Sequence, residues 1–240
     1  MPLMALEQIG LPQALGRVLG EDLVARRTQP PKPVSSMDGY AAKINDLTSI
    51  PTKLKVVGEV PAGTSYKGQI KDGESVRIFT GAPVPKGADL IIIQENTQKE
   101  GEFVKIIKGK PTVGQFIRPA GLDFKNGEIL LKAGRSITSR DIGLIAGMNI
   151  PWLMVRRRPK IAIISTGDEI VMPGNFIGSN QIVSSNGLAL SAFINASGGE
   201  TIDLGIAPDT AKDLQELAKQ AKNVDMLVTC GGASVGEHDL

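Results

Sequence analysis

The sequence KIAIISTGDE, at residues 160–169, decides the fold class of the second half of this 240-residue chain. A short, almost entirely apolar run that ends in small and acidic residues is typical of a buried parallel strand and its loop. Similar apolar runs follow at 201–206 and 225–230, with helical patterns at 187–197 and 211–222 between them. This alternation of strands and helices predicts a parallel α/β sheet.

Each predicted strand is followed by a loop that carries carboxylates and, in two of the three, glycines. Because the carboxyl ends of parallel strands meet at one edge of a sheet, where ligands bind, we expect these loops to lie together. Their carboxylates are Asp168, Glu169, Asp209, Glu237 and Asp239. Clustered carboxylates with glycine-rich loops suggest Mg²⁺ held against a phosphorylated substrate. Taken singly, each carboxylate could instead cap the next helix.

The loop at 232–236 reads GASVG, which matches the G-x-S-x-G turn of serine hydrolases. A hydrolase triad needs a histidine from a separate, later loop, and the only histidine is His238 in the same loop. We therefore disfavour a hydrolase and interpret Ser234 as a hydroxyl donor to a phosphate or oxyanion. Ser185 and Asn186 either cap the predicted helix or face a ligand at its N-terminus.

The first half of the chain predicts a β domain inserted into a discontinuous first domain. Apolar residues at helical spacing predict an amphipathic helix at 11–25, and a second helix is expected at 140–146, with Thr138 as its cap. Between them, apolar runs separated by Pro and Gly turns predict a small β domain. The runs are 53–57, 74–79, 90–94 and 103–107.

The composition is that of an ordinary cytosolic protein. With 27 basic and 25 acidic residues, the net charge of +2 gives no reason to expect a nucleic-acid or membrane partner. No apolar run is long enough to span a membrane, and no secretory signal precedes the first elements. The single cysteine, Cys230, excludes an internal disulfide.

Five motifs together resemble the MoeA-type molybdopterin molybdenumtransferases, a family that includes the gephyrin E domain. They are SSMDGYA at 35–41, IFTGA at 78–82 with GAD at 87–89, RPAGLD at 118–123, STGDE at 165–169 and GGASVGEHD at 231–239. Their order and separations agree with the family, and the match covers nearly the whole chain.

The resemblance implies a multidomain α+β and α/β fold. Domain I, helical and extended, would comprise 1–33 and 126–157 and would form a homodimer with active sites shared between subunits. Domain II would be the inserted β domain at 34–125. Domain III, 158–240, would be a molybdopterin-binding, MogA-like α/β domain that is incomplete at Leu240, so we expect the sequence to be a fragment.

The resemblance also implies the reaction, which is the insertion of molybdenum from molybdate into adenylylated molybdopterin with Mg²⁺-dependent hydrolysis of the adenylate. The residues that match the family's catalytic positions are Asp38, Thr80, Asp123, Glu169, Asp209 and Asp239, of which Glu169 and Asp239 would contact the metal. Substrate contacts would come from Ser165, Gly167, Asp168, Ser185, Asn186, Gly231, Gly232 and Ser234. A MogA-type adenylyltransferase would be a partner.

The chain departs from the family pattern in two places. Family members commonly have a serine where Cys230 precedes Gly231, so a hydroxyl contact is lost. Groups for molybdate lie partly beyond Leu240, so we expect the fragment to fold and dimerise without activity. A non-enzymatic scaffold of the same fold, as in the gephyrin E domain, is the alternative function, and the intact carboxylate set favours chemistry over it.

Overall fold

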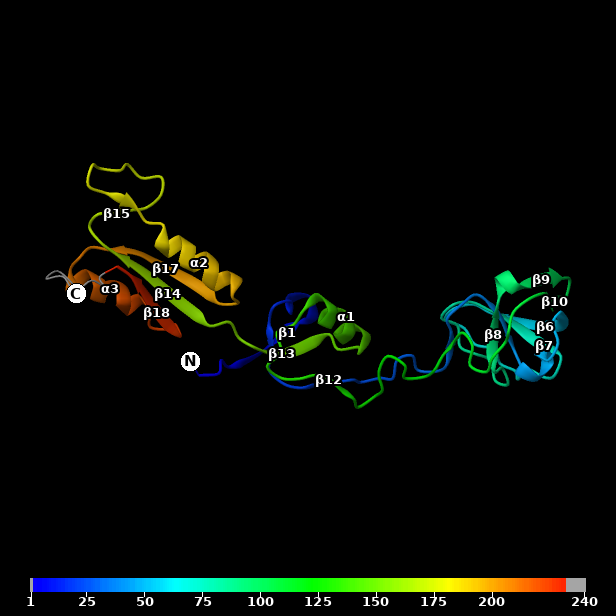
Figure 1. The fold of residues 1–240 in the computed structure, drawn as a ribbon. Helices are drawn as coiled ribbons and strands as arrows, with labels where there is room; N and C mark the ends of the chain where they lie inside the picture. Colours follow the sequence, from blue (N-terminus) through cyan, green and yellow to red (C-terminus); the bar gives the residue numbers. More distant parts are fainter. Residues whose placement is uncertain (1, 232–240) are drawn as a thin grey trace. The chain divides into compact units, whose positions relative to one another are not determined.

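The parallel sheet predicted from the KIAIISTGDE segment is present in the computed structural model, which describes residues 2–231 (Figure 1). Its strands run in the order β17-β14-β18, and every neighbouring pair is parallel. They are β14 (Lys160–Thr166), β17 (Glu200–Ala207) and β18 (Met226–Cys230). Residues 161–166 of the central strand β14 are all buried, as expected for a strand with neighbours on both sides and cover on both faces.

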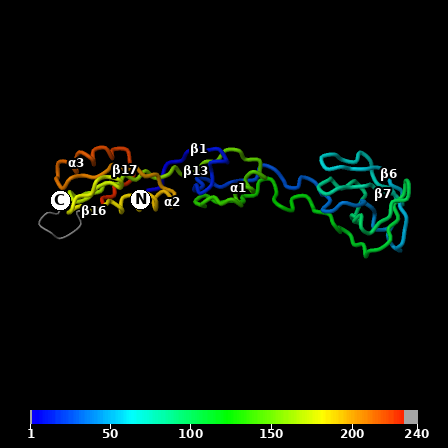
Figure 2. The backbone as a smooth tube through the Cα atoms, turned by 90° about the horizontal axis from the view of Figure 1, so that it is seen from above, coloured from blue at the N-terminus to red at the C-terminus, as the bar shows by residue number. Residues whose placement is uncertain are grey.

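Two helices connect these strands, α2 (Asn186–Ala196) and α3 (Ala211–Gln220). The crossover from β14 to β17 runs in one direction across the sheet, and the crossover from β17 to β18 runs back past β14. Because such crossovers are right-handed, opposite directions place the helices on opposite faces. Figure 2 shows α2 and α3 on the two sides of the sheet. The prediction of a parallel α/β sheet is therefore confirmed.

By internal packing, the chain divides into two compact units. Unit 1 comprises Met1–Asp22, Lys132–Gly143 and Pro151–Leu240, and it contains the parallel sheet. Unit 2 comprises Leu23–Leu131 and Leu144–Ile150. Both units are therefore assembled from segments that are separated in the sequence. No helix in the described residues 2–231 is long and apolar enough to cross a membrane.

Unit 2 is built on a six-stranded sheet with the order β8-β5-β7-β6-β10-β9. Its strands are β5 (Gly39–Ala42), β6 (Thr52–Val60), β7 (Glu74–Ile78), β8 (Leu90–Ile93), β9 (Thr97–Glu100) and β10 (Phe103–Ile106). All neighbours are antiparallel except β6 and β7. The four strands predicted here are confirmed, whereas β5 and β9 had no prediction.

Both faces of strands β5 and β8 in this sheet are buried. Tyr40 and Ala42 of β5 belong to one apolar cluster, and Ala41 belongs to the other. Leu90 and Ile91 of β8 are divided between the clusters in the same way. Successive residues of a strand point to opposite faces. The small residues of β5 therefore fit between two apolar layers.

Two short strand pairs accompany this sheet within unit 2. One joins β3 (Leu23–Val24) to β12 (Ile129–Leu131), and the other joins β4 (Val34–Ser35) to β11 (Ile117–Arg118). Both pairs are antiparallel, so the two ends of the long segment of unit 2 are hydrogen-bonded to each other.

The helix predicted at 11–25 is wrong. Only Leu11–Gln13 forms a helical turn, and the chain then enters β2 (Val18–Leu19). This strand belongs to a three-stranded sheet with the order β1-β13-β2, in which β13 (Trp152–Arg156) lies between β1 (Leu6–Gly10) and β2. Gly16 has a φ of 73°, a left-handed conformation that ends any right-handed helix. Pairing with a strand far along the chain overrides the helical spacing of the apolar residues.

The second predicted helix is confirmed as α1 (Ser139–Gly147). The backbone N–H of Asp141 donates to Thr138 Oγ1 (3.3 Å), and the Asp141 carboxylate accepts from the Thr138 N–H (2.9 Å). This reciprocal arrangement satisfies backbone donors at the start of the helix.

Candidate functional site

A cleft of about 210 Å³ lies in unit 1, at the carboxyl ends of β14 and β18 and beside the start of α2. This is the edge of an open parallel sheet at which ligands bind. The sequence-predicted residues that line it are Ser165, Glu169, Ser185, Asn186 and Gly231. The structure therefore brings together residues from three separate segments of the chain.

Thr166, the last residue of β14, places an unsatisfied hydroxyl at this cleft. The residue is only 9% exposed, and its Oγ1 has no hydrogen-bond partner in the described part of the chain. Buried polar atoms are nearly always hydrogen-bonded, so an orphaned one indicates a missing partner. Thr166 is not among the predicted site residues, although a hydroxyl directly after an apolar run is a sequence signal that points to it.

Gly231 makes room around that hydroxyl. A Cβ atom at this position would lie 2.5 Å from Thr166 Oγ1, and the φ of 113° is one that residues with side chains rarely adopt. Only glycine therefore leaves space next to the Thr166 hydroxyl. The neighbouring Cys230 also lines the cleft, and burial, followed by the charge of Asp203, raises the pKa of its thiol. The thiol is consequently neutral at physiological pH.

The start of α2 contributes polar groups to the same cleft. Ser185 occupies the N-cap position, but its side chain makes no capping hydrogen bond, so its hydroxyl is not committed to the helix. A Cβ atom on the buried Gly187 would lie 3.0 Å from Ser165 Oγ, so glycine allows β14 to approach the helix start closely. A helix N-terminus attracts anions through its free N–H groups and its dipole.

The loop carboxylates are distributed between this cleft and its surroundings. Glu169 lines the cleft and folds back over Gly167, whose added Cβ would lie 2.6 Å from a Glu169 carboxylate oxygen. Asp168 accepts a hydrogen bond from the backbone N–H of Asp209 (3.3 Å). Asp209 does not cap α3, because Thr210 does so by accepting from the Asp213 N–H. Capping is thus excluded for Asp209.

Three predicted residues, Gly232, Ser234 and Asp239, lie outside the described residues. Within residues 2–231, no group of three or more His, Cys, Asp or Glu side chains is placed to hold a metal ion. Glu169 supplies one carboxylate to the cleft. Mg²⁺ typically takes one or two protein carboxylates and completes its shell with water and substrate phosphate. The donor set fits that mode of binding.

The catalytic residues predicted in the first half lie in unit 2, and two of them are in direct contact. Asp38 Oδ1 accepts from the backbone N–H of Thr80 (2.8 Å) and from its hydroxyl (2.7 Å). These two hydrogen bonds, with the charge of Arg77, lower the pKa of Asp38 below its ordinary value. The carboxylate is therefore ionised at neutral pH.

Arg77, which was not predicted, contacts the chain neighbours of Asp38 and Thr80. Its guanidinium lies 4.6 Å from the ring centroid of Phe79 and 5.2 Å from that of Tyr40. It donates to the carbonyl of Gly39, which adjoins Asp38, at 3.1 Å. Cation–π contacts of this kind hold a guanidinium in place.

Asp123, the third predicted residue of unit 2, has different neighbours. Its carboxylate accepts from Arg118 Nη2 at 2.9 Å, and both residues line a cleft of about 530 Å³. In the described structure no hydrogen bond joins Asp123 to Asp38. The predicted catalytic set is thus divided into the Asp38–Thr80 pair, the Arg118–Asp123 pair and the cleft of unit 1.

The chain thus combines a parallel α/β sheet that has a polar cleft at its carboxyl edge with a β unit that carries an ionised carboxylate. Two family models match this chain. Residues 2–148 match the MoeA N-terminal region (domain I and II), and residues 162–240 match a probable molybdopterin binding domain. The chain belongs to the MoeA family.

Individual relatives agree with this assignment. A molybdopterin molybdenumtransferase of Nostoc sp. is 37% identical over 238 residues, which cover 97% of this chain and 54% of the relative. One from Haemophilus influenzae is 33% identical and covers 98% of this chain and 58% of the relative. The crystal structure of the molybdopterin biosynthesis MoeA protein from Pyrococcus horikoshii OT3 has a TM-score of 0.85 at 31% identity, covering 94% of this chain and 61% of that one. The chain spans a little over half the length of these curated relatives.

Proposed function

We propose that this chain acts in molybdenum cofactor biosynthesis, in the transfer of molybdenum from molybdate to adenylylated molybdopterin. Its relatives carry the name of that enzyme. The observation that carries the proposal is the buried hydroxyl of Thr166, which lies in a cleft beside a helix N-terminus and has no hydrogen-bond partner among residues 2–231. Such a hydroxyl is a ready donor to a phosphate oxygen of the substrate.

Different residues of the chain bind the substrate and assist the hydrolysis. Ser165, Thr166 and the start of α2 bind the phosphate portion of the substrate in the cleft of unit 1. During hydrolysis a water oxygen attacks phosphorus, the phosphoanhydride bond breaks and AMP leaves, so a proton has to be taken from the water. Asp38 of unit 2 is an ionised carboxylate and stays a proposed catalytic residue, because it matches a catalytic position of the family.

We also propose that Glu169 and Asp239 hold Mg²⁺, which would screen the negative charge of the substrate phosphates. We also propose a division into three domains, with domain I at 1–33 and 126–157, domain II at 34–125 and domain III from 158. The proposed location is the cytoplasm, and the proposed partner is a MogA-type adenylyltransferase that supplies the substrate. A homodimer is supported by the exposed apolar residues Leu15 and Trp152 in unit 1.

Equilibrium binding of adenylylated molybdopterin to the purified chain tests the proposal. The informative variant is Thr166→Val, which keeps the shape and removes the hydroxyl. It should weaken binding about tenfold, the loss expected for one hydrogen bond to a charged group. Because the hydroxyl has no hydrogen-bond partner within residues 2–231, the thermal stability should stay the same or rise. Absence of any binding to the wild-type chain would refute the proposal.

A further inference from the structure

A second cleft of unit 1, with a volume of about 470 Å³, takes no part in the proposed function. It lies where the chain enters β14, between the residues at 2–4, the turn at 16–18, the connection at 156–159 and the residues that follow α2. The substrate cleft lies at the other end of β14, and no residue lines both clefts. Because β14 has seven residues with a rise of about 3.3 Å each, its two ends are about 20 Å apart. The volume is in the range of small-molecule sites.

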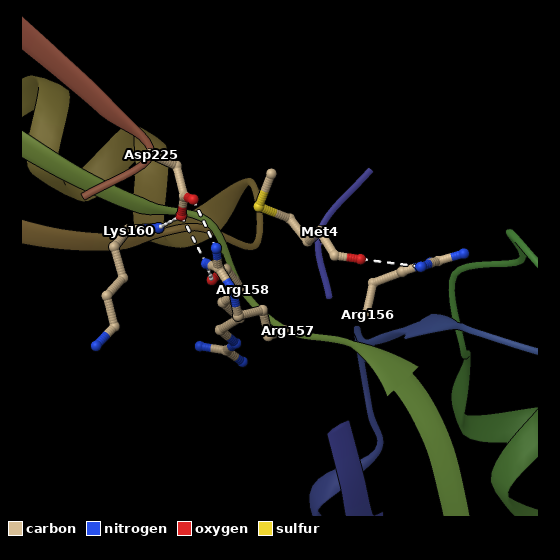
Figure 3. A network of polar contacts seen from close by, with 6 residues as sticks. All are labelled: Met4, Arg156, Arg157, Arg158, Lys160 and Asp225. Carbon is tan, nitrogen blue, oxygen red and sulfur yellow. Dashed lines mark hydrogen bonds and ion pairs between the residues drawn. The ribbon is translucent and has the colours of Figure 1, made fainter. Parts of the chain in front are cut away.

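Four arginines, and no acidic residue of the described chain, line this second cleft. They are Arg17, Arg156, Arg157 and Arg158. Arg17 pairs with Glu7, and its side chain is only 10% exposed. Arg157 donates to both carboxylate oxygens of Asp225 (Figure 3). These two guanidinium groups are therefore fixed in place, and carboxylates outside the lining compensate their charge.

The other two guanidinium groups keep their full charge. Neither Arg156 nor Arg158 forms an ion pair with any residue in the range 2–231. Arg156 Nη1 donates to the carbonyl of Met4 at 2.9 Å, which orients the guanidinium (Figure 3). A guanidinium has five N–H donors, so most of them remain available to a ligand. Two uncompensated positive charges on one concave surface concentrate a positive potential there, which an anion would relieve.

Neutral residues complete the lining of the second cleft. Ser136 and Ser197 contribute hydroxyl groups, which can donate to phosphate oxygens as well as accept. Pro2, Leu3 and Pro159 contribute apolar surface. A cleft with charged donors on one part of its wall and apolar side chains on another is typical of sites for small organic anions.

We infer that this second cleft binds a small molecule with two phosphate groups, one on the guanidinium of Arg156 and one on that of Arg158. The parallel N–H donors of a guanidinium match the oxygens of a phosphate group. A ligand with a single phosphate would occupy one of these forks and leave the other unpaired. The two groups are joined either directly, as in pyrophosphate, or through a carbon frame that lies against the apolar part of the wall. The inference goes beyond the proposed function, because the second cleft shares no lining residue with the substrate cleft.

Isothermal titration of the purified chain with pyrophosphate, fructose 1,6-bisphosphate and inorganic phosphate, in buffer without Mg²⁺, tests the inference. Arg156→Gln and Arg158→Gln should each weaken binding of the ligands with two phosphates about tenfold, the loss expected for hydrogen bonds to a charged group. Arg158→Lys keeps the charge without the fork and should bind with an intermediate affinity. Arg140→Gln is the matched control, because Arg140 is exposed on α1 and does not line the cleft. Circular dichroism melting confirms that the variants remain folded.

The three ligands distinguish the source of the phosphate groups. Fructose 1,6-bisphosphate that binds more tightly than pyrophosphate supports an organic ligand, and the reverse order supports an inorganic one. Thr166→Val should leave this binding unchanged, and a loss in that variant would place the ligand in the substrate cleft and overturn the inference. The inference is also wrong if inorganic phosphate binds as tightly as the other two ligands, if none of the three binds, or if Arg158→Gln binds as tightly as the wild type.

Discussion

The guanidinium of Arg157 donates to both carboxylate oxygens of Asp225, with each nitrogen–oxygen distance at 2.6 Å (Figure 3). Asp225 also accepts from the backbone N–H of Lys160 at 2.8 Å. Asp225 directly precedes β18 and Arg157 lies just before β14, so the pair joins the amino ends of two adjacent parallel strands. The fork of a guanidinium matches a carboxylate in this two-point geometry.

This ion pair should make the stability of unit 1 depend on pH in the acid range. The hydrogen bond from Arg157 and that from Lys160 lower the pKa of Asp225 from 3.8 to about 2. Since the folded chain has the lower pKa, the contribution of the carboxylate is complete above pH 3.8 and is lost as the pH falls towards 2. Urea unfolding of the wild type and Asp225→Asn across this range should show two free energies of unfolding that converge at low pH. A difference that stays constant with pH would contradict the prediction.

The contact between Asp38 and Thr80 should be visible in the titration of a single carboxyl group. In the wild type, the pKa of Asp38 should lie below its ordinary value of 3.8. Thr80→Ala removes the hydroxyl donor and keeps the backbone N–H, so the pKa should rise part of the way back. Thr80→Ser, which retains both donors, should leave it unchanged. Carbon-detected NMR of the Asp38 carboxyl provides the measurement, and equal pKa values in all three proteins would disprove the assignment.

Gly39 should tolerate no larger residue, because the backbone of the neighbouring strand β8 lies too close to it. A Cβ atom at this position would lie 1.9 Å from the carbonyl oxygen of Ile92. Gly39→Ala should therefore reduce the free energy of unfolding of unit 2 by about 1–3 kcal/mol, the usual cost of overpacking. The control is Gly143→Ala in α1, where no atom lies within 4 Å of the added Cβ. That variant should be stabilised by about 0.5–1 kcal/mol, because alanine favours helix.

The capping contact at the start of α1 gives a prediction of smaller size. Thr138→Ala leaves the Asp141 N–H without its acceptor and removes the hydroxyl bond to the Asp141 carboxylate, which is 2.8 Å long in the wild type. The free energy of unfolding should fall by about 1 kcal/mol. Thr138→Ser keeps the cap and should stay close to the wild type in the same denaturant titration. Equal losses in the two variants would show that the methyl group, and not the cap, is what matters.

The strands and helices of the parallel sheet could be predicted from the sequence because their signals are local. β14 is a continuous apolar run, and α3 has a regular apolar stripe with Thr210 at its start, so neither depends on knowing the partner elements. The prediction of a helix at 11–25 was wrong for the opposite reason. Its apolar residues fit a helix, but Val18 and Leu19 pair with β13, whose position cannot be derived from the segment itself.

The same distinction applies to the candidate site. The motifs SSMDGYA and IFTGA could be recognised separately, but their contact depends on the register between β5 and β7, in which Gly39 lies opposite Ile78. That register places Asp38 beside Thr80. The hydroxyl of Thr166, which has no hydrogen-bond partner within residues 2–231, is likewise a property of packing. No spacing of residue types along the chain encodes either feature.

The pairing of β1 with β13 has a consequence for how the protein is made. During translation β1 leaves the ribosome long before β13, so Leu6 must wait for Arg156, its partner at the end of β13. All six strands of the unit 2 sheet are complete before then, and their segment is closed by the pairing of Val24 with Ile129. Unit 2 can therefore fold while the nascent chain is still growing, whereas the backbone of β1 stays an open strand edge until synthesis has passed residue 156. A pause of the ribosome after the unit 2 strands are complete and before residue 156 is synthesised would prolong the interval in which β1 can pair with another chain.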